Sequence, residues 1–196
     1  ATEWNKGVPP AVRELTKTFE YNRIDTLHRL FRENPGEIAA VIMEPVGAMP
    51  PENHFLHQVQ ELALREGAVF ILDEIITGFR FAMGGAQEFF GVIPDLATFG
   101  KAMSNGMPLS ALVGRAEIMK EMEEVFFSFT FGGEALSLAA SLATIKEMEE
   151  KRVLEHIWRQ GAKLQEGYNR IAGGLGLMDY TRMTGYPPRP IASFFP

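Results

Sequence analysis

The first half of the chain alternates strand-like and helix-like segments. Two unbroken apolar runs, 38–43 and 68–72, are typical of strands covered on both faces, as in a parallel sheet. Between them, residues 54–66 carry apolar side chains at helical spacing, and a glycine follows. Shorter strand candidates lie at 94–99 and 110–114. This order predicts an α/β fold with a mostly parallel sheet and crossover helices.

The pattern differs at the two ends of the chain. Residues 1–23 have few periodic apolar positions and indicate an irregular segment, after which Asp25 is expected to cap a short helix at 26–32. Two apolar stripes between 133 and 171 predict long helices, with the charged run 146–152 as a solvated face or a junction between them. The last residues look like the start of a strand, so we expect the chain to be a fragment.

Composition narrows the possible functions of the 196-residue chain. Apolar residues make up 46% and charged residues 22%, which is typical of a globular protein. The formal charge of −6 argues against a nucleic-acid partner, and no run of about 18 apolar residues predicts a membrane span. The absence of cysteine excludes disulfides and thiolate chemistry and fits a cytoplasmic location.

Three ionisable residues follow predicted strands at regular spacing. Glu44 and Asp73 are separated by 29 residues, and Asp73 and Lys101 by 28, each about one β-α-β unit. Neighbouring parallel strands joined by crossovers end at the same edge of a sheet, where ligands bind in open α/β folds. We therefore expect two carboxylates and a lysine to meet at one crevice.

Such a trio suits several kinds of chemistry. A lysine in a partly desolvated site can act as a base or form a Schiff base. Pyridoxal phosphate needs a lysine for its aldehyde and an acid for its pyridinium nitrogen, so the trio is compatible with this cofactor. The spacing alone does not identify the cofactor.

Two other interpretations have weaker support. An apolar strand ending in Asp73-Glu74 also resembles the magnesium-binding strand of an ATPase, but the phosphate loop G-x-x-x-x-G-K-[ST] is missing around Lys101. His54 and His57 share a helix face, yet no further ligand pattern completes a zinc site, and we predict no metal.

Four ordered blocks of residues resemble the class III aminotransferases, which are pyridoxal-phosphate enzymes of fold type I. The blocks are 41–46 (VIMEPV), 72–80 (LDEIITGFR), 94–101 (PDLATFGK) and 129–133 (FTFGG). The resemblance is strong over about residues 36–145 and is closest to the glutamate-1-semialdehyde aminomutase branch. It implies transfer of an amino group by an aminotransferase, or its internal shift by an aminomutase, which is an isomerase. The partners would be a small-molecule amino donor and acceptor.

The resemblance also implies roles for individual residues. Lys101 matches the lysine that forms the internal aldimine and moves the substrate proton, and Asp73 matches the acid at the pyridine nitrogen. Ile75 matches the residue packed under the ring, although plain core packing is an alternative. Thr130 matches the threonine that binds the cofactor phosphate of the neighbouring subunit, which implies a homodimer with shared sites. Glu44 matches a carboxylate on the substrate side of the site, with a structural ion pair or strand cap as the alternative.

The family comparison also sets expectations for domains and for differences. A complete member is roughly twice this length. Residues 1–145 would then be part of the cofactor-binding large domain, and residues 146–196 a helical connection and the start of a small C-terminal domain. Departures occur at Ile76, in the loop 104–108 and at 133–135, and they concern substrate identity more than cofactor use. The alternative function is a non-catalytic or truncated domain of this fold that serves as a binding or assembly module.

Overall fold

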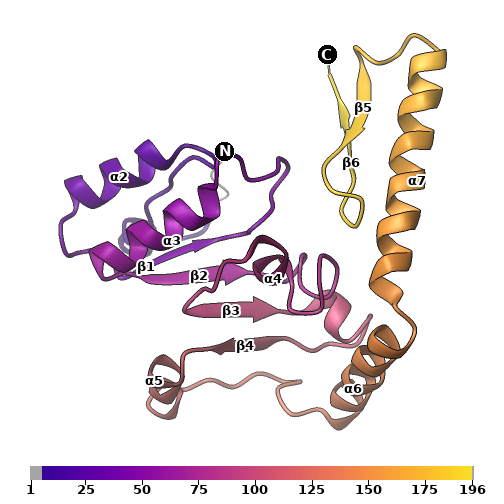
Figure 1. Cartoon of the computed structure of the whole chain (residues 1–196). Coiled ribbons are helices and arrows are strands. Elements are labelled where there is room, and N and C mark those ends of the chain that lie inside the picture. Colours follow the sequence, from indigo (N-terminus) through magenta and orange to yellow (C-terminus); the bar gives the residue numbers. More distant parts are fainter. Residues whose placement is uncertain (1–5, 196) are drawn as a thin grey trace.

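The centre of the molecule is a four-stranded sheet with the order β1-β2-β3-β4 (Figure 1). A computed structural model describes residues 6–195. Strands β1, β2 and β3 are parallel, and β4 is antiparallel to β3. The strands are β1 (Ala40–Met43), β2 (Val69–Asp73), β3 (Leu96–Phe99) and β4 (Ala111–Gly114). The predicted α/β fold with a mostly parallel sheet is confirmed, with each strand slightly shorter than or displaced from its apolar run.

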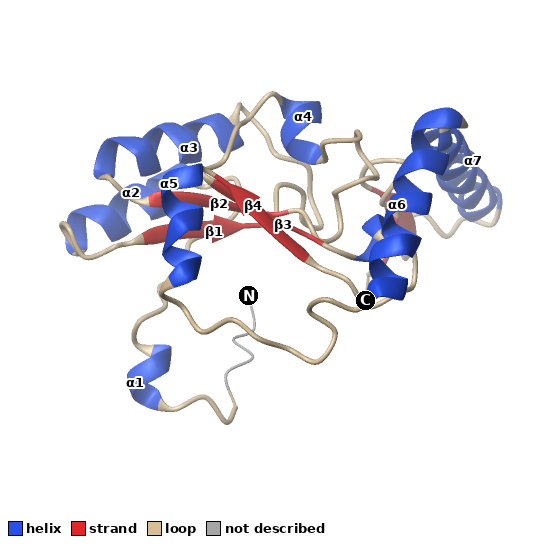
Figure 2. Cartoon of the chain, turned by 90° about the horizontal axis from the view of Figure 1, so that it is seen from below, coloured by secondary structure: helices blue, strands red, loops and turns tan. Residues whose placement is uncertain are grey.

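Helices α2 (Ile24–Glu33) and α3 (Phe55–Glu66) cover one face of the sheet and enclose the main core (Figure 2). Buried strand residues alternate, with Val41 and Met43 of β1 beside Phe70 and Leu72 of β2. The intervening Ile42 is 60% exposed. The expectation that both faces are covered is therefore wrong for the described part of this chain, because residues 6–195 supply a helical layer to only one face of β1.

The ends of these helices differ from the sequence prediction in one case. Asp25 does not cap α2; it lies in the first turn and forms an ion pair with Arg23, with 3.0 Å between Oδ1 and Nε. Thr26 fixes the start of the helix instead, since its hydroxyl donates to the Arg23 carbonyl and accepts from the Glu20 amide. The predicted end of α3 is confirmed, because Gly67 adopts φ +73°, a conformation that favours glycine.

Two long helices follow the sheet, as predicted. They are α6 (Ala135–Glu150) and α7 (Val153–Gly174), and the charged run marks their junction, where Arg152 has φ +51°. Helix α6 runs across the predicted domain boundary at 145, which itself stays a prediction. The chain then forms an antiparallel hairpin of β5 (Thr181–Thr184) and β6 (Ile191–Phe194). The sequence suggested β6 but not β5.

Short elements complete the described chain. They are α1 (Pro10–Arg13), α4 (Ala86–Phe90), α5 (Ala116–Met119) and the 3-10 turns η1 (Lys101–Met103) and η2 (Lys120–Glu123). Helix α1 lies in the segment expected to be irregular, of which residues 1–5 fall outside the described part. Every helix within residues 6–195 is too short or too polar to cross a membrane.

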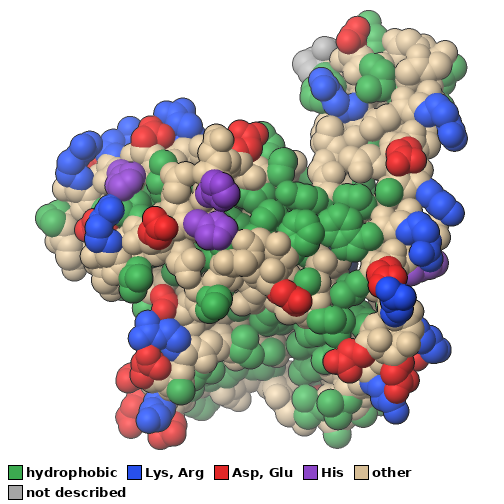
Figure 3. Space-filling model, viewed as in Figure 1, with side chains coloured by type: hydrophobic (Ala, Val, Ile, Leu, Met, Phe, Trp, Pro, Cys, Tyr) green, Lys and Arg blue, Asp and Glu red, His purple; other side chains and the backbone are tan. Residues whose placement is uncertain are grey.

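An aromatic cluster joins the segment between β2 and β3 to α7 and to the turn of the hairpin. The buried ring of Phe81 lies 5.9 Å from the ring of Trp158 and 5.2 Å from that of Tyr186, measured between centroids. The indole of Trp158 also donates a 3.2 Å hydrogen bond to the Phe81 carbonyl. Figure 3 shows apolar side chains gathered across this middle region, with charged side chains around it. The cluster packs the C-terminal part of the chain beside the edge where the parallel strands end.

Candidate functional site

The three predicted strand ends lie at one edge of the sheet, whereas a crevice shared by Glu44, Asp73 and Lys101 stays a prediction. Glu44 directly follows β1, Asp73 is the last residue of β2, and Lys101 comes two residues after β3. Because these three strands are parallel neighbours, all three residues lie at the carboxyl edge of one sheet. This is the edge at which open α/β sheets bind ligands.

The Asp73 carboxylate is held in one orientation. Its Oδ1 accepts a 3.0 Å hydrogen bond from the Ile75 amide and a 3.3 Å bond from the Thr98 hydroxyl. Thr98 stands opposite Asp73 in the register of β2 and β3. No donor within residues 6–195 is found on Oδ2. The carboxylate therefore has one fixed oxygen and one oxygen available to a ligand.

Lys101 lies next to the turn that follows Asp73. A Cβ added to Gly100 would be 3.6 Å from Cγ2 of Ile75, so the Ile75 side chain lies against the backbone that leads into Lys101. Lys101 is exposed and has φ +42°, an uncommon conformation for a residue other than glycine. Such strain is concentrated at functional sites, where the surrounding structure maintains it.

The turn that carries Lys101 is hydrogen-bonded to helix α6. The buried hydroxyl of Ser141 on α6 donates a 3.1 Å hydrogen bond to the carbonyl of Met103, the last residue of η1. The Ser104 hydroxyl donates a 2.7 Å bond to the Met107 carbonyl and closes the following turn. Lys101 therefore lies on a short segment between β3 and β4 that a hydrogen bond from α6 holds in place.

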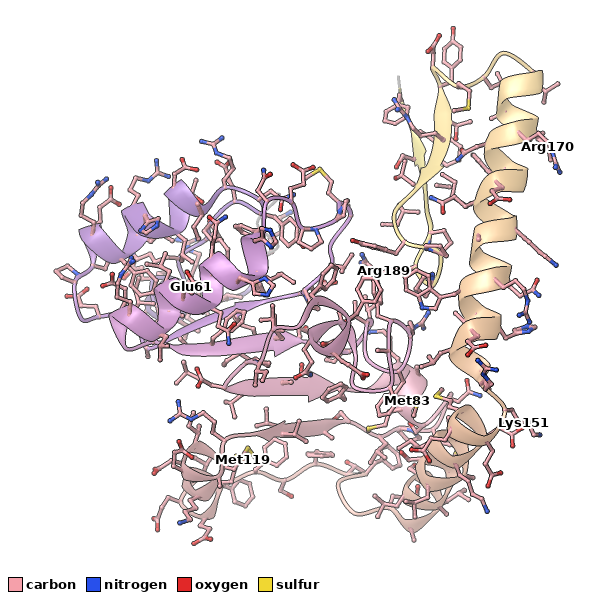
Figure 4. All side chains as sticks on the ribbon, in the orientation of Figure 1. Glu61, Met83, Met119, Lys151, Arg170 and Arg189 are labelled. Carbon is pink, nitrogen blue, oxygen red and sulfur yellow. The ribbon has the colours of Figure 1, made fainter. Side chains whose placement is uncertain are left out.

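Glu44 has a partner that sequence reasoning missed. Arg189 lies in the turn between β5 and β6 and extends from the hairpin toward the loop after β1 (Figure 4). Its Nη2 lies 3.4 Å from Oε2 of Glu44, and its Nη1 donates to the carbonyls of Val46, at 3.0 Å, and Gly47. This geometry favours the structural ion pair, and a substrate role for Glu44 stays a prediction.

A half-buried tyrosine is hydrogen-bonded to the same loop. The Tyr21 hydroxyl donates a 2.6 Å hydrogen bond to the Pro45 carbonyl. Burial raises the pKa of Tyr21 above its usual range, and the nearby Tyr186 adds to that shift while Arg189 opposes it. Tyr21 is therefore a neutral structural donor.

The structure does not bring Thr130 to Asp73 and Lys101. Thr130 is exposed, in the irregular segment between η2 and α6, and no hydrogen bond among residues 6–195 connects it to the strand ends. Its expected action in the neighbouring subunit's site stays a prediction. The imidazoles of His54 and His57 stack edge to face at the start of α3, and within the described residues no three His, Asp or Glu side chains are grouped to hold a metal.

One enzyme family matches most of the chain. A model of the class III aminotransferases matches residues 7–183. The chain belongs to this family, which confirms the resemblance inferred from the four sequence blocks.

Individual relatives give the comparison more detail. The chain is 44% identical over 173 residues to the glutamate-1-semialdehyde 2,1-aminomutase of Alkaliphilus oremlandii, which covers 84% of this chain and 41% of that protein. The chain spans about 40% of the length of the curated relatives it matches.

Solved structures show the same fold. The structure of the FumI protein of Sphingopyxis sp. MTA144, in its PLP internal aldimine form, matches with a TM-score of 0.89 at 26% identity. The match covers 96% of this chain and 47% of the FumI chain. An omega-transaminase from Sphaerobacter thermophilus has a TM-score of 0.84 at 29% identity, with coverages of 95% and 44%.

Proposed function

We propose that this chain is part of a pyridoxal-phosphate-dependent enzyme that transfers an amino group, or moves it within one molecule, on a small amino or oxo substrate. One observation carries the proposal: Asp73 ends β2 and Lys101 follows the neighbouring parallel strand β3 at the same edge, with the Ile75 side chain against Gly100. Membership in the class III aminotransferases supports the same conclusion.

The residues at the edge fit the ring of the cofactor. Asp73 keeps Oδ2 available while its Oδ1 is engaged, as an acid paired with a ring nitrogen requires. Lys101 supplies the amine that would hold the cofactor covalently through its aldehyde carbon, and Ile75 offers an apolar surface for one ring face. When bound, pyridoxal phosphate supplies a protonated ring that withdraws electrons from the substrate's α-carbon.

Each residue then has a distinct task. Asp73, held by Thr98 and the Ile75 amide, would keep a proton on the ring nitrogen by placing a fixed negative charge beside it. The amine of Lys101 would take up and return the proton of the substrate's α-carbon as a general base and acid. Thr130 would bind the cofactor phosphate of a neighbouring subunit, so the active form would be a homodimer.

The substrate is defined less closely than the cofactor. The aminomutase relatives make an internal amine shift on a semialdehyde such as glutamate 1-semialdehyde the first substrate class to test. Transfer between a separate small-molecule donor and acceptor is the second, because the structural neighbours include transaminases. A cytoplasmic location stays part of the proposal. A non-catalytic module of the same fold remains the alternative function.

Covalent labelling of the full-length protein tests the proposal. After incubation with pyridoxal phosphate, borohydride reduction should fix a pyridoxyl group on the peptide that contains Lys101. Lys101→Ala should lose the label and the turnover, whereas Lys120→Ala, on an exposed turn away from the strand ends, should keep both. Label on another lysine, or wild-type turnover in Lys101→Ala, would contradict the proposed function and favour the non-catalytic alternative.

A further inference from the structure

Glu74 is a fully buried carboxylate placed between two residues of the proposed cofactor site. It follows Asp73 and precedes Ile75, and its exposed fraction is 0%. Side chains alternate along a strand, so Glu74 leaves β2 on the side opposite to Asp73. Within residues 6–195, the hydrogen bonds of its carboxylate go to Thr77, Ala86 and Gln87, none of which is expected to meet the cofactor ring.

The Glu74 carboxylate closes the loop that follows β2. Its Oε2 accepts a 2.9 Å hydrogen bond from the Ala86 amide and a short bond from the Thr77 hydroxyl. Its Oε1 accepts a 2.6 Å bond from the Gln87 amide. Since Ala86 and Gln87 are the first residues of α4, the carboxylate joins the two ends of the loop 75–85.

The backbone of Glu74 is bound as completely as its side chain. Its amide donates a 2.9 Å hydrogen bond to the carbonyl of Thr98, the residue whose hydroxyl holds Asp73. Its carbonyl accepts a 2.7 Å bond from the Gly78 amide. The position of Glu74 therefore determines where its neighbours Asp73 and Ile75 can lie.

A charge in this place requires a physical reason. Burial raises the pKa of the Glu74 carboxyl, while the Thr77 hydroxyl and the amides of Ala86 and Gln87 oppose that shift. A buried carboxylate is costly unless its oxygens are hydrogen-bonded, and here both are. In return, a carboxylate with donors on both oxygens has a single orientation, which an apolar side chain of the same size would lack.

We propose that Glu74 is a positioning residue for the cofactor, an inference that rests on the proposed function. By joining the ends of the loop 75–85, it fixes the turn through which Asp73 reaches the ring nitrogen and Ile75 reaches the ring face. Removing its negative charge would loosen this turn. Cofactor affinity and the protonation of the ring nitrogen would then decrease together.

The test uses Glu74→Gln in the full-length protein, with Glu88→Gln as the matched control. Glu88 lies on α4 and is exposed, and its carboxylate accepts a 2.6 Å hydrogen bond from the Gly84 amide at the same end of the loop. In Glu74→Gln, the amide group of the new side chain must face a backbone N–H, so one hydrogen bond is lost and two donors oppose each other.

Three measurements separate positioning from a structural role. The dissociation constant of the apoprotein for pyridoxal phosphate should rise at least ~10-fold in Glu74→Gln, as expected for loss of one charge-assisted hydrogen bond, and less than ~2-fold in Glu88→Gln. The nitrogen-15 shift of the labelled cofactor ring should move toward the unprotonated value only in Glu74→Gln. Hydrogen exchange of the Ala86 and Gln87 amides in the apoprotein should also accelerate in that variant.

The outcomes distinguish this inference from the proposed function. A wild-type protein that does not bind pyridoxal phosphate would overturn the proposed function and this inference with it. A wild-type protein that binds, with a folded Glu74→Gln of unchanged affinity and ring-nitrogen shift, would overturn the inference alone. If Glu74→Gln does not fold, Thr77→Val carries the test: it should lower affinity, and Thr77→Ser should restore it. Equal affinity of those two variants would refute the inference.

Discussion

Gly85 is the residue at which a single methyl group should disturb the loop most. It precedes α4 with φ +88° and ψ −166°, a backbone conformation that is nearly restricted to glycine. A Cβ at this position would lie 2.7 to 2.8 Å from three atoms of the Glu74 carboxyl group. Gly85→Ala therefore combines backbone strain with a collision against a buried charge.

The magnitude can be worked from these two terms. Backbone strain of this kind costs of order 1–3 kcal/mol. Relief of the collision requires the carboxylate to move and to lose at least one of its hydrogen bonds, which are worth about 1.5–3 kcal/mol each when the acceptor is charged. The sum predicts that the free energy of unfolding falls by about 2.5–6 kcal/mol in Gly85→Ala.

Gly91, at the other end of the same helix, is the matched control. It has φ +68° and ψ +36°, and a Cβ added there would meet no atom within 4 Å. Gly91→Ala therefore carries only the strain of the left-handed conformation, roughly 1–2 kcal/mol. The two substitutions are chemically identical and lie six residues apart, so their difference reports the contact with Glu74 together with the greater backbone strain at Gly85.

Urea unfolding of the two variants, followed by tryptophan fluorescence, measures the difference. Trp158 reports on the region because its ring stacks on Phe89 of α4, with centroids 5.4 Å apart. At an m value of about 2 kcal/mol/M, the Gly85→Ala midpoint should lie roughly 1–2 M below that of Gly91→Ala. Equal midpoints at equal m would show that Glu74 is free to move, which would refute the reasoning.

Three further predictions concern other parts of the structure. Phe81→Ala should lower the free energy of unfolding by about 3–5 kcal/mol because it removes the centre of the aromatic cluster. The control Leu164→Ala, on the exposed side of α7, should change it by less than about 0.5 kcal/mol, and urea unfolding measures both. Arg189→Lys should release the β5–β6 turn from the loop after β1 and lower the free energy of unfolding by about 1–3 kcal/mol. Hydrogen exchange in that turn should become faster, and unchanged exchange would contradict the role of the guanidinium group. The hydroxyl and amide of Ser137 lower the pKa of the Glu134 carboxyl at the start of α6. Because the folded pKa lies below the unfolded one, this stabilisation is present at neutral pH and is lost below about pH 4, so the first turn of α6 should exchange faster in acid, and Glu134→Gln should remove the pH dependence.

The sheet and its ligand-binding edge could be predicted because both depend on local patterns. Apolar runs located three parallel strands, and spacing of about one β-α-β unit put Glu44, Asp73 and Lys101 at the same edge. The predicted capping residue of α2 was wrong because Asp and Thr can both cap a helix. Thr26 forms hydrogen bonds with two backbone groups, while the Asp25 side chain pairs with Arg23, two residues earlier.

Contacts between segments far apart in the chain could not be predicted in this way. Arg189 reaches carbonyls 142 and 143 residues earlier, and no local pattern in a hairpin turn indicates such a partner. The open face of β1 has a related cause. The apolar run 38–43 predicts a strand covered on both faces, yet Ile42 is exposed because residues 6–195 supply a helical layer to only one face of β1.

The adjacent pair Asp73-Glu74 shows how one strand end can serve two purposes. In the sequence the two carboxylates look equivalent, but side chains at successive strand positions point to opposite faces of the sheet. Asp73 is half-buried and keeps one oxygen available, whereas Glu74 is fully buried and has every oxygen bound. The half-buried acid suits a ligand and the buried acid suits the loop that places it. The strand period alone could have assigned these two roles, since a strand whose apolar residues Phe70 and Leu72 face the core must also direct Glu74 inward.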